Sequence, residues 1–390
     1  MKVSKKLIAV LLGLIIIGGA GTVIVQRQSQ ANQAQEARRA KKKTAKLVAK
    51  KNAQLSRKVN RMTFSKDQSA TTHITKVLKL SHFVGTALVV KNNQVIYQKG
   101  FGYADHATSA LNDPATKYQI LSVQKSITAV GIMQLVEAGK VKLSDPISTY
   151  YPSITAGKNT TIRQMLDMTT GFWLNDGSTK PLSEAATVKY ALKHLTYRPK
   201  KVGVFNYSSV NYLLLAGIIR QETGKSYQHF FTTHIIDKLG LQRTGFVVNG
   251  LGQAGSKGYQ ATAKQIKPTY AKRMPETKAQ MHNELGTGQV YMSVGDLFKV
   301  ESAILKGKLI PKTAVATLHT RTATGEYGGG VYNISNGVRS HGIGYGYESD
   351  VHLSTNGKTG VILLSNYRRR AASIEIPANK LFSELMNGDL

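Results

Sequence analysis

The chain has 390 residues, enough for one large domain or two small ones, and its 53 Lys and Arg against 21 Asp and Glu give a net charge of +32. It has no cysteine, which excludes disulfide bonds, thiolate zinc sites and cysteine nucleophiles. The ten histidines show no H-E-x-x-H or other metal-binding spacing, so we expect no metal and no other cofactor.

An apolar segment, LIAVLLGLIIIGGAGTVIV, occupies residues 7–25 and follows a short basic stretch. As a helix it would span about 29 Å, close to the ~30 Å hydrocarbon core of a bilayer. No small-residue cleavage site follows it, so the sequence favours a transmembrane anchor over residues 1–25, with a cleaved signal peptide as the alternative. Basic residues are denser before the segment than directly after it, which predicts an extracellular C-terminal portion, and the absence of cysteine suits a Gram-positive envelope.

Residues 26–64 are predicted to form a basic stalk between this anchor and a folded body over residues 65–390. The stalk is rich in Gln, Ala and Lys, has Glu36 as its single acidic residue and shows no sustained apolar stripe. Basic residues outnumber acidic ones in the body as well, and such a surface concentrates polyanions around it. For an exported protein we expect anionic lipid headgroups or teichoic acids as partners. No nucleic-acid-binding module is visible, so we expect no nucleic acid.

The body begins with residues 85–105, which alternate in polarity around Asn-Asn and predict a β-hairpin. Residues 120–136, ILSVQKSITAVGIMQLV, then predict an apolar helix with Lys125 in its first turn. Lys125 follows Ser122 by three residues, a spacing that puts both side chains on one helix face. A hydroxyl and an amine so placed can share a proton, and burial favours a neutral lysine. This is the only S-x-x-K in the chain; the alternative is a solvated helix start with an extended lysine.

The remaining segments predict more helices and a second hairpin. Residues 344–367 alternate in polarity around Asn356-Gly357, a strong turn signal. Helices are predicted over residues 160–173, 206–223, 229–241 and 376–386. Strands near both ends with helices between them predict an α+β fold, in which one antiparallel sheet is built from both ends of the chain, is flanked by helices and carries a helical subdomain.

Five stretches, in this order and spacing, resemble the serine β-lactamase and penicillin-binding-protein superfamily, and within it the class C-like serine hydrolases and esterases. They are SVQKSITAVGIMQLVEAGKVKLSDPISTYYP, TTIRQMLDMTTGF, FNYSSVNYLLLAGII, LGLQRTGF and VILLSNY. The resemblance runs from about residue 80 to the C-terminus. It implies a β-lactamase/transpeptidase-like fold and acyl transfer through a covalent acyl-enzyme that water resolves. No G-x-S-x-G motif supports an α/β-hydrolase instead.

The resemblance implies roles for matching residues. Ser122 would be the nucleophile, Lys125 its partner in proton transfer, and Tyr207 a further acid and base; without Ser122 upstream, Tyr207 would be interpreted as an aromatic residue flanking a helix. Ser209 stands where the family usually has the Asn of a Tyr-x-Asn motif, which donates to a substrate amide. Serine is shorter and offers one donor hydrogen, so this substrate-binding position is poorly suited to peptide or β-lactam amides.

The third family motif is usually a Lys or His, then Thr or Ser, then Gly on an edge strand. Residues 358–360 read Lys-Thr-Gly, but they follow the Asn356-Gly357 turn. They also lead into VILLSNY, which resembles the strand after the motif strand. We therefore interpret residues 358–360 as the exit of a hairpin.

The stretch SHGIGYGY is the favoured third motif. In it His341 would be the cationic or polar substrate-binding residue, and Gly342 or Gly344 would allow close approach of a backbone. A backbone N–H from this strand and that of Ser122 would form the oxyanion hole.

Three functions remain open at this point. The first is an esterase that removes D-alanyl groups from teichoic or lipoteichoic acid, because the Tyr-x-Ser pattern resembles D-alanyl-teichoic acid esterases and a basic, outward-facing body suits a polyanion. The second is a D-alanyl-D-alanine carboxypeptidase or low-affinity penicillin-binding protein acting on peptidoglycan stem peptides. The third is a non-catalytic wall-binding protein, which the intact Ser122, Lys125 and Tyr207 set disfavours.

Overall fold

The computed structural model describes residues 68–390, except 263–266 and 322–324, together with scattered residues between 28 and 43. The chain divides into two units, Met1–Asn52 and Ala53–Leu390. In the first unit, residues 35–40 are helical, and the anchor expected at residues 7–25 lies outside the described residues. Within the described part of the chain, no helix combines the length and the apolar character needed to cross a membrane.

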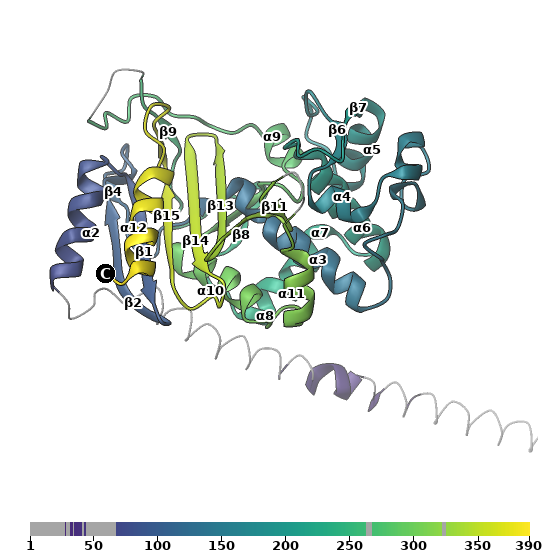
Figure 1. The fold of residues 1–390 in the computed structure, drawn as a ribbon, viewed down its shortest axis with the longest axis horizontal. Coiled ribbons are helices and arrows are strands. Elements are labelled where there is room, and N and C mark those ends of the chain that lie inside the picture. Colours follow the sequence, from purple (N-terminus) through teal and green to yellow (C-terminus); the bar gives the residue numbers. More distant parts are fainter. Residues whose placement is uncertain are drawn as a thin grey trace, which may run out of the picture. The chain divides into compact units, whose positions relative to one another are not determined.

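The second unit is built on a seven-stranded antiparallel sheet with the strand order β11-β12-β13-β14-β15-β1-β2 (Figure 1). Strand β1, from the start of this unit, pairs with β15, from near its end, so the sheet is assembled from both ends of the chain as predicted. The strands are β1 Gly85–Lys91, β2 Gln94–Phe101, β11 Tyr327–Gly328, β12 Val331–Ile334, β13 Gly337–Gly344, β14 Tyr347–Ser354 and β15 Gly360–Ser365.

Both predicted hairpins form, and their turns explain why. Asn92 and Asn93 join β1 to β2 with φ angles of 51° and 67°, the left-handed conformation that asparagine tolerates better than most residues. Gly357 has φ 66° in the loop between β14 and β15. Residues 358–360 leave that loop and enter β15, which lies between β14 and β1 inside the sheet. They are therefore a hairpin exit, as the sequence indicated.

Helices cover the two faces of the sheet. The helices α2, Gln68–Leu80, and α12, Glu375–Asn387, pack on one face, where they meet side chains such as Val89 and Leu363. The intervening side chains, such as Leu88 and Ile362, point to the other face and join the main core, to which α3 and α10 contribute. This division follows from the two-residue period of a strand. The helices of the main core are α3 Gln124–Glu137 and α10 Val294–Leu305.

A helical subdomain lies beside the sheet, drawn in teal at the right of Figure 1. The predicted helix over residues 160–173 is shorter than expected: it ends after one turn, Met168 takes φ 54°, and residues 170–173 pair as a strand with residues 196–202. Tertiary pairing overrides the local helical pattern here. The elements of the subdomain are α4 Ile162–Leu166, β6 Thr170–Trp173, α5 Glu184–His194, β7 Thr196–Val202, α6 Val210–Thr223 and α7 Tyr227–Phe231. The short helix α8, Asp237–Leu239, follows and lies near α10 and α11 (Figure 1).

Shorter elements complete the unit. The segment predicted as one helix over residues 229–241 contains the end of α7, a π-helical turn at Thr232–Ile236 and α8. The others are β3 Tyr103–Asp105, β4 Ala110–Leu111, β5 Tyr118–Gln119, β8 Gly245–Phe246, β9 Tyr259–Gln260, α9 Lys278–Asn283, β10 Val290–Met292, α11 Lys312–Leu318 and β16 Tyr367–Arg368.

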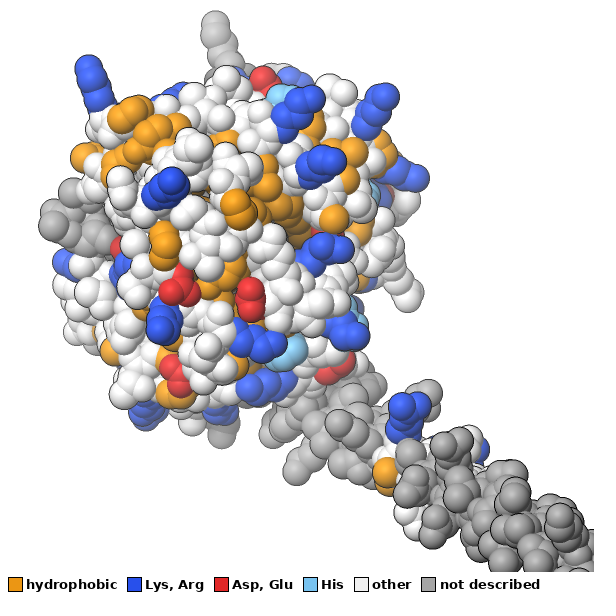
Figure 2. Space-filling view, turned by 90° about the vertical axis from the view of Figure 1, so that its right-hand side faces the viewer, with side chains coloured by type: hydrophobic (Ala, Val, Ile, Leu, Met, Phe, Trp, Pro, Cys, Tyr) orange, Lys and Arg blue, Asp and Glu red, His pale blue; other side chains and the backbone are white. Residues whose placement is uncertain are grey.

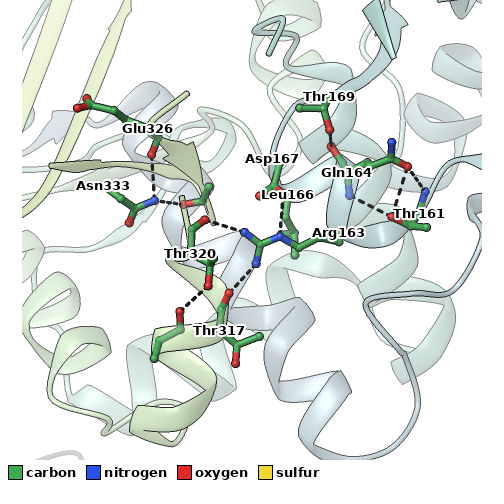
Figure 3. A network of polar contacts seen from close by, with 12 residues as sticks. Thr161, Arg163, Gln164, Leu166, Asp167, Thr169, Thr317, Thr320, Glu326 and Asn333 are labelled. Atoms are coloured by element: carbon green, nitrogen blue, oxygen red, sulfur yellow. Dashed lines mark hydrogen bonds and ion pairs between the residues drawn. The ribbon is translucent and has the colours of Figure 1, made fainter. Parts of the chain in front are cut away.

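Arg163 of α4 joins the helical subdomain to the end of α11 and the residues just after it (Figure 3). Its Nε donates to Asp167 Oδ2 at 2.7 Å, and its terminal nitrogens donate to the carbonyl oxygens of Thr317 and Thr320 at 2.5 and 2.9 Å. At the start of α4, Thr161 and Gln164 form a reciprocal capping box. These contacts hold the end of α4, and therefore Met168, in place.

Candidate active site

Ser122 lies in a single 3-10 turn, Leu121–Val123, that runs directly into α3. Leu121, the residue before Ser122, is buried in the main core and takes φ 51°. This left-handed conformation costs a residue that has a Cβ about 1–2 kcal/mol. Strain of this kind persists only where the surrounding packing imposes it, and it is frequent at active sites. The sharp turn presents Ser122 at the start of the helix, with Lys125 in the first helical turn.

Lys125 is fully buried, and its Nζ donates to two oxygens. One is Ser122 Oγ at 2.9 Å, and the other is the carbonyl oxygen of Thr287 at 3.2 Å. The extended, solvated lysine is thereby excluded. The two hydrogen bonds point the amine at the hydroxyl, which is the arrangement that proton transfer requires.

Tyr207 comes to the same place from the helical subdomain. Lys125 Nζ lies 5.3 Å from the centroid of its ring. The backbone on either side of Tyr207 is held by Met168, because Asn206 N–H donates to the Met168 carbonyl at 2.9 Å and Ser208 N–H donates to its sulfur at 3.4 Å. These contacts also explain why α6 begins at Val210 and not at residue 206. The structure thus brings Ser122, Lys125 and Tyr207 together from two parts of the sequence.

A pocket of about 450 Å³ opens beside Tyr207, and we call it the Tyr207 pocket. Ser209, which is exposed at the start of α6, is among the residues that line it. Thr287, whose carbonyl oxygen accepts from Lys125, lines it as well. The other lining residues are Trp173, Leu174, Asn175, Gly177, Ser208, Val210, Leu213, Gln280, Asn283, Glu284 and Tyr345.

Strand β13 closes the site on its other side, where two predicted glycines allow close approach. A Cβ on Gly342 would lie 2.4 Å from the carbonyl oxygen of Ile120 and 3.0 Å from the backbone nitrogen of Ser122. A Cβ on Gly344 would lie 3.0 Å from Leu121 Cδ2. At position 342, where the contacts are with backbone atoms, only glycine lets this strand pass so near the nucleophile.

The turn after β13 indicates which backbone N–H of the strand faces the site. Tyr345 and Gly346 have φ 48° and 82°, as in a two-residue type I′ turn, so the flanking pair Gly344 and Tyr347 is hydrogen-bonded. The backbone groups of Ile343 then point away from β14. Those groups point toward the side of β13 on which β12 lies. Among the described residues, β12 pairs with β13 only as far as Arg339, so no strand pairs with Ile343 on that side. Ile343 and Ser122 are therefore the candidate N–H donors of an oxyanion hole.

The structure does not bring His341 to this group. In the sheet, His341 pairs with Asp350, and Asp350 pairs with Leu363 on the next strand. Directly paired residues share a face, and Leu363 lies on the face covered by α12, so His341 lies on that face too. Its Nε2 lies 3.0 Å from Glu348 Oε1. The strand period gives the reason: Gly342 and Gly344 face the nucleophile, so His341 faces the opposite side.

A group of titratable residues surrounds His341 on that far face. The ligand atoms of His341, Asp350 and Glu375 lie within 4.8 Å of one another. Each has an ion-pair partner, respectively Glu348, His352 and Arg339. Burial alone would lower the pKa of His341, but its hydrogen bond to Glu348 and the nearby carboxylates outweigh burial and raise it. We interpret the group as an ion-pair network that ties β13 and β14 to α12.

Several residues of the site were not identified from the sequence. Thr287 orients Lys125 through a backbone carbonyl oxygen, and because every residue has one, the sequence gives no indication of this role. Glu284 lines the Tyr207 pocket, and its place in the short stretch ELGTGQ could have been noticed as an acid beside two glycines in a basic chain. Glu301 of α10 accepts from Ser126 Oγ at 2.6 Å, next to Lys125, and burial raises its pKa to about 7.

Comparison with known proteins agrees with this geometry. The family model described as Beta-lactamase matches residues 71–373. PbpX of Bacillus subtilis strain 168, named as a candidate penicillin-binding protein, is 30% identical over 354 residues, which cover 89% of this chain and 84% of PbpX. A teichoic acid D-alanine hydrolase of Staphylococcus aureus is 30% identical over 300 residues, which cover 76% of this chain and 73% of that protein.

Solved structures share the fold. The crystal structure of FmtA from Staphylococcus aureus superposes with a TM-score of 0.74 at 27% identity, covering 84% of this chain and 92% of FmtA. A D-amino acid amidase from Ochrobactrum anthropi SV3 has the same fold, with a TM-score of 0.70 at 19% identity, covering 83% of this chain and 100% of the amidase. Family match, fold and relatives agree, and the chain belongs to the beta-lactamase family of serine hydrolases.

Proposed function

We propose that this serine hydrolase is an esterase that removes D-alanyl groups from teichoic or lipoteichoic acid. The observation that carries the proposal is the group formed by Ser122, Lys125 and Tyr207, together with a serine, Ser209, in the pocket that Tyr207 lines. An ester needs less help from an amide-binding side chain than a peptide does, and its carbonyl is the more reactive. The similarity to a teichoic acid D-alanine hydrolase supports the same substrate.

In the proposed mechanism Ser122 Oγ attacks the carbonyl carbon of the D-alanyl ester. Its proton passes to the group formed by Lys125 and Tyr207. This group then gives a proton to the departing oxygen of the polymer, which leaves as a hydroxyl group. The N–H groups of Ser122 and Ile343 would stabilise the oxyanion. Water then attacks the D-alanyl-enzyme by the same route, and D-alanine is released.

A location at the outer face of the cell membrane is part of this proposal. The apolar residues 7–25 would anchor the chain, and the stalk would carry the catalytic unit toward the envelope polymer. The charge of +32 favours a polyanionic substrate. Figure 2 shows Lys and Arg side chains spread over the face in view, where Asp and Glu are fewer.

A second function, D-alanyl-D-alanine carboxypeptidase, uses the same nucleophile, and the similarity to PbpX favours it. It requires recognition of a peptide amide, for which Ser209 offers a shorter side chain with a single donor hydrogen. The two functions therefore differ in the bond that is cleaved and share the catalytic group.

The test is to incubate the full-length protein, in detergent, with D-alanylated lipoteichoic acid and separately with a pentapeptide ending in D-alanyl-D-alanine. We expect release of D-alanine from the polymer, little from the peptide, and poor labelling by fluorescent penicillin. Ser122→Ala protein serves as the control in each reaction. Rapid cleavage of the peptide with no action on the ester would replace the esterase with the carboxypeptidase.

A further inference from the structure

Glu284 is the one charged side chain among the described residues that line the Tyr207 pocket. Thr287 Oγ1 donates to its Oε2 at 2.9 Å, and Tyr345 OH donates to its Oε1 at 3.2 Å. A carboxylate oxygen has room for more than one donor, so both oxygens can still accept from a ligand. The two contacts hold the carboxylate in one orientation at the wall of the pocket.

This carboxylate is close to the nucleophile. A Cβ on Gly288 would lie 2.5 Å from Glu284 Oε2 and 3.3 Å from the Cα of Leu121, so a single glycine separates Glu284 from the residue before Ser122. The two are also linked through Thr287, whose side chain bonds Glu284 and whose carbonyl oxygen accepts from Lys125. Tyr345, the other partner of Glu284, follows the strand segment that carries Ile343 and Gly344.

The acyl group of the proposed substrate has a feature that such a carboxylate would recognise. An alanyl ester carries a free α-ammonium group, and its nitrogen is two bonds from the carbonyl carbon that Ser122 attacks. Any group that binds the ammonium must therefore lie close to the nucleophile, and Glu284 lines the same pocket as Tyr207. A protein with a net charge of +32 otherwise repels this cation.

We infer that Glu284 binds the α-ammonium group of the acyl moiety and so selects amino-acyl esters over plain acyl esters. The inference rests on the proposed function, and it specifies how the acyl group of the substrate is recognised. It makes Glu284 a specificity-determining residue and assigns it no proton transfer.

A second acid, Glu276, lies near Glu284. Burial and the proximity of Glu284 raise the pKa of Glu276 to about 8, so Glu276 is mostly protonated at neutral pH. Its Oε1 lies 3.5 Å from Gln119 Nε2, and it is not among the residues that line the pocket. Glu276 is therefore a matched control for Glu284: it is close by, but it does not line the pocket.

The experiment compares two chromogenic esters, D-alanyl and propionyl p-nitrophenyl ester, which differ by the ammonium group. Values of kcat/KM for the full-length protein are divided by the rate of each ester with hydroxide, which removes the difference in intrinsic reactivity. We expect a preference of tenfold or more for the D-alanyl ester. Glu284→Gln should abolish that preference by lowering kcat/KM for the D-alanyl ester far more than for the propionyl ester, and Glu276→Gln should retain it.

The outcomes separate the inference from the function on which it rests. Equal loss on both esters in Glu284→Gln would overturn the inference, since Glu284 would then act by holding Thr287. A wild-type protein that shows no preference for the ammonium group would overturn it as well. Failure of the proposed esterase function would look different: neither ester would be hydrolysed in a way that depends on Ser122.

Discussion

Lys125 places its fully buried Nζ 2.9 Å from the Oγ of Ser122, with the carbonyl oxygen of Thr287 as its other partner. In the described part of the chain no carboxylate forms an ion pair with this lysine. Burial of an amine with two neutral oxygens is costly for stability alone, since a buried charge normally requires a compensating partner. The arrangement is better explained by catalysis than by stability.

The first prediction concerns this pair and Tyr207. Ser122→Ala should lower the rate of ester hydrolysis by several orders of magnitude, because it removes the attacking oxygen. It should lower the free energy of unfolding by only about 1 kcal/mol, the typical net contribution of one hydrogen bond. Lys125→Ala and Tyr207→Phe should also be strongly impaired, and the double variants no worse than Ser122→Ala. Substantial turnover by Ser122→Ala protein would refute the mechanism.

A second prediction tests the approach of β13 to the nucleophile. In Gly342→Ala the new Cβ would meet backbone atoms at 2.4 and 3.0 Å, so the strand or the Ser122 turn must shift. We expect kcat to fall tenfold or more and the free energy of unfolding to fall by about 1–3 kcal/mol. Gly344→Ala is the matched comparison, because its Cβ would meet only the end of the Leu121 side chain, which can move. Equal effects of the two substitutions would contradict this geometry.

Ser209 gives a third prediction, on the choice between ester and amide. Ser209→Asn restores a side chain with two N–H donors and a carbonyl oxygen beside the Tyr207 pocket. We expect faster acylation by peptide or β-lactam substrates, measured by labelling with fluorescent penicillin, while hydrolysis of the D-alanyl ester changes less. Ser208→Asn, at a buried neighbouring position, is not expected to have this effect. An unchanged rate of labelling would mean that residue 209 does not control the choice.

Glu301 supports a fourth prediction, on the pH dependence of stability. Burial raises its pKa from 4.5 to about 7 in the folded protein. The folded state therefore holds this proton more tightly than the unfolded state, and stability falls as pH rises from about 4.5 to 7. The shift corresponds to a loss on the order of 3 kcal/mol. Glu301→Gln should thus be more stabilising at pH 8 than at pH 5 by chemical denaturation; the opposite order would be inconsistent with a raised pKa.

The last prediction concerns the basic charge. If the net charge of +32 attracts the polymer, binding to lipoteichoic acid should weaken steeply as salt rises from about 0.05 to 0.5 M, because the screening length shrinks over this range. Sedimentation of the Ser122→Ala protein with the polymer measures binding without turnover. Binding that is insensitive to salt would leave the charge without this role.

Much of this fold and part of its site could be predicted from sequence patterns, because the signals are local. The Asn92-Asn93 and Asn356-Gly357 turns are encoded in adjacent residues that tolerate left-handed backbone. The spacing of Ser122 and Lys125 suffices to put both on one helix face, whatever packs around them. The apolar patterns of the strands and of α3 likewise predict an α+β fold without knowledge of the partners.

Other features depend on contacts between distant segments. The helix expected over residues 160–173 ends early because residues 170–173 find a strand partner in residues 196–202. The position of His341 also depends on tertiary structure. Its local sequence suits a strand at the active site, but alternate side chains of a strand point to opposite faces of the sheet. A shift of one residue in register therefore decides which side chains of β13 face the nucleophile. The turn at Tyr345 and the close contact of Gly342 with Ser122 fix the register in which the glycines, and not His341, face the nucleophile. Thr287 contacts Lys125 only through tertiary packing, because its position relative to α3 depends on long-range contacts that no local pattern encodes. The same holds for the approach of Glu284 to Leu121 across Gly288.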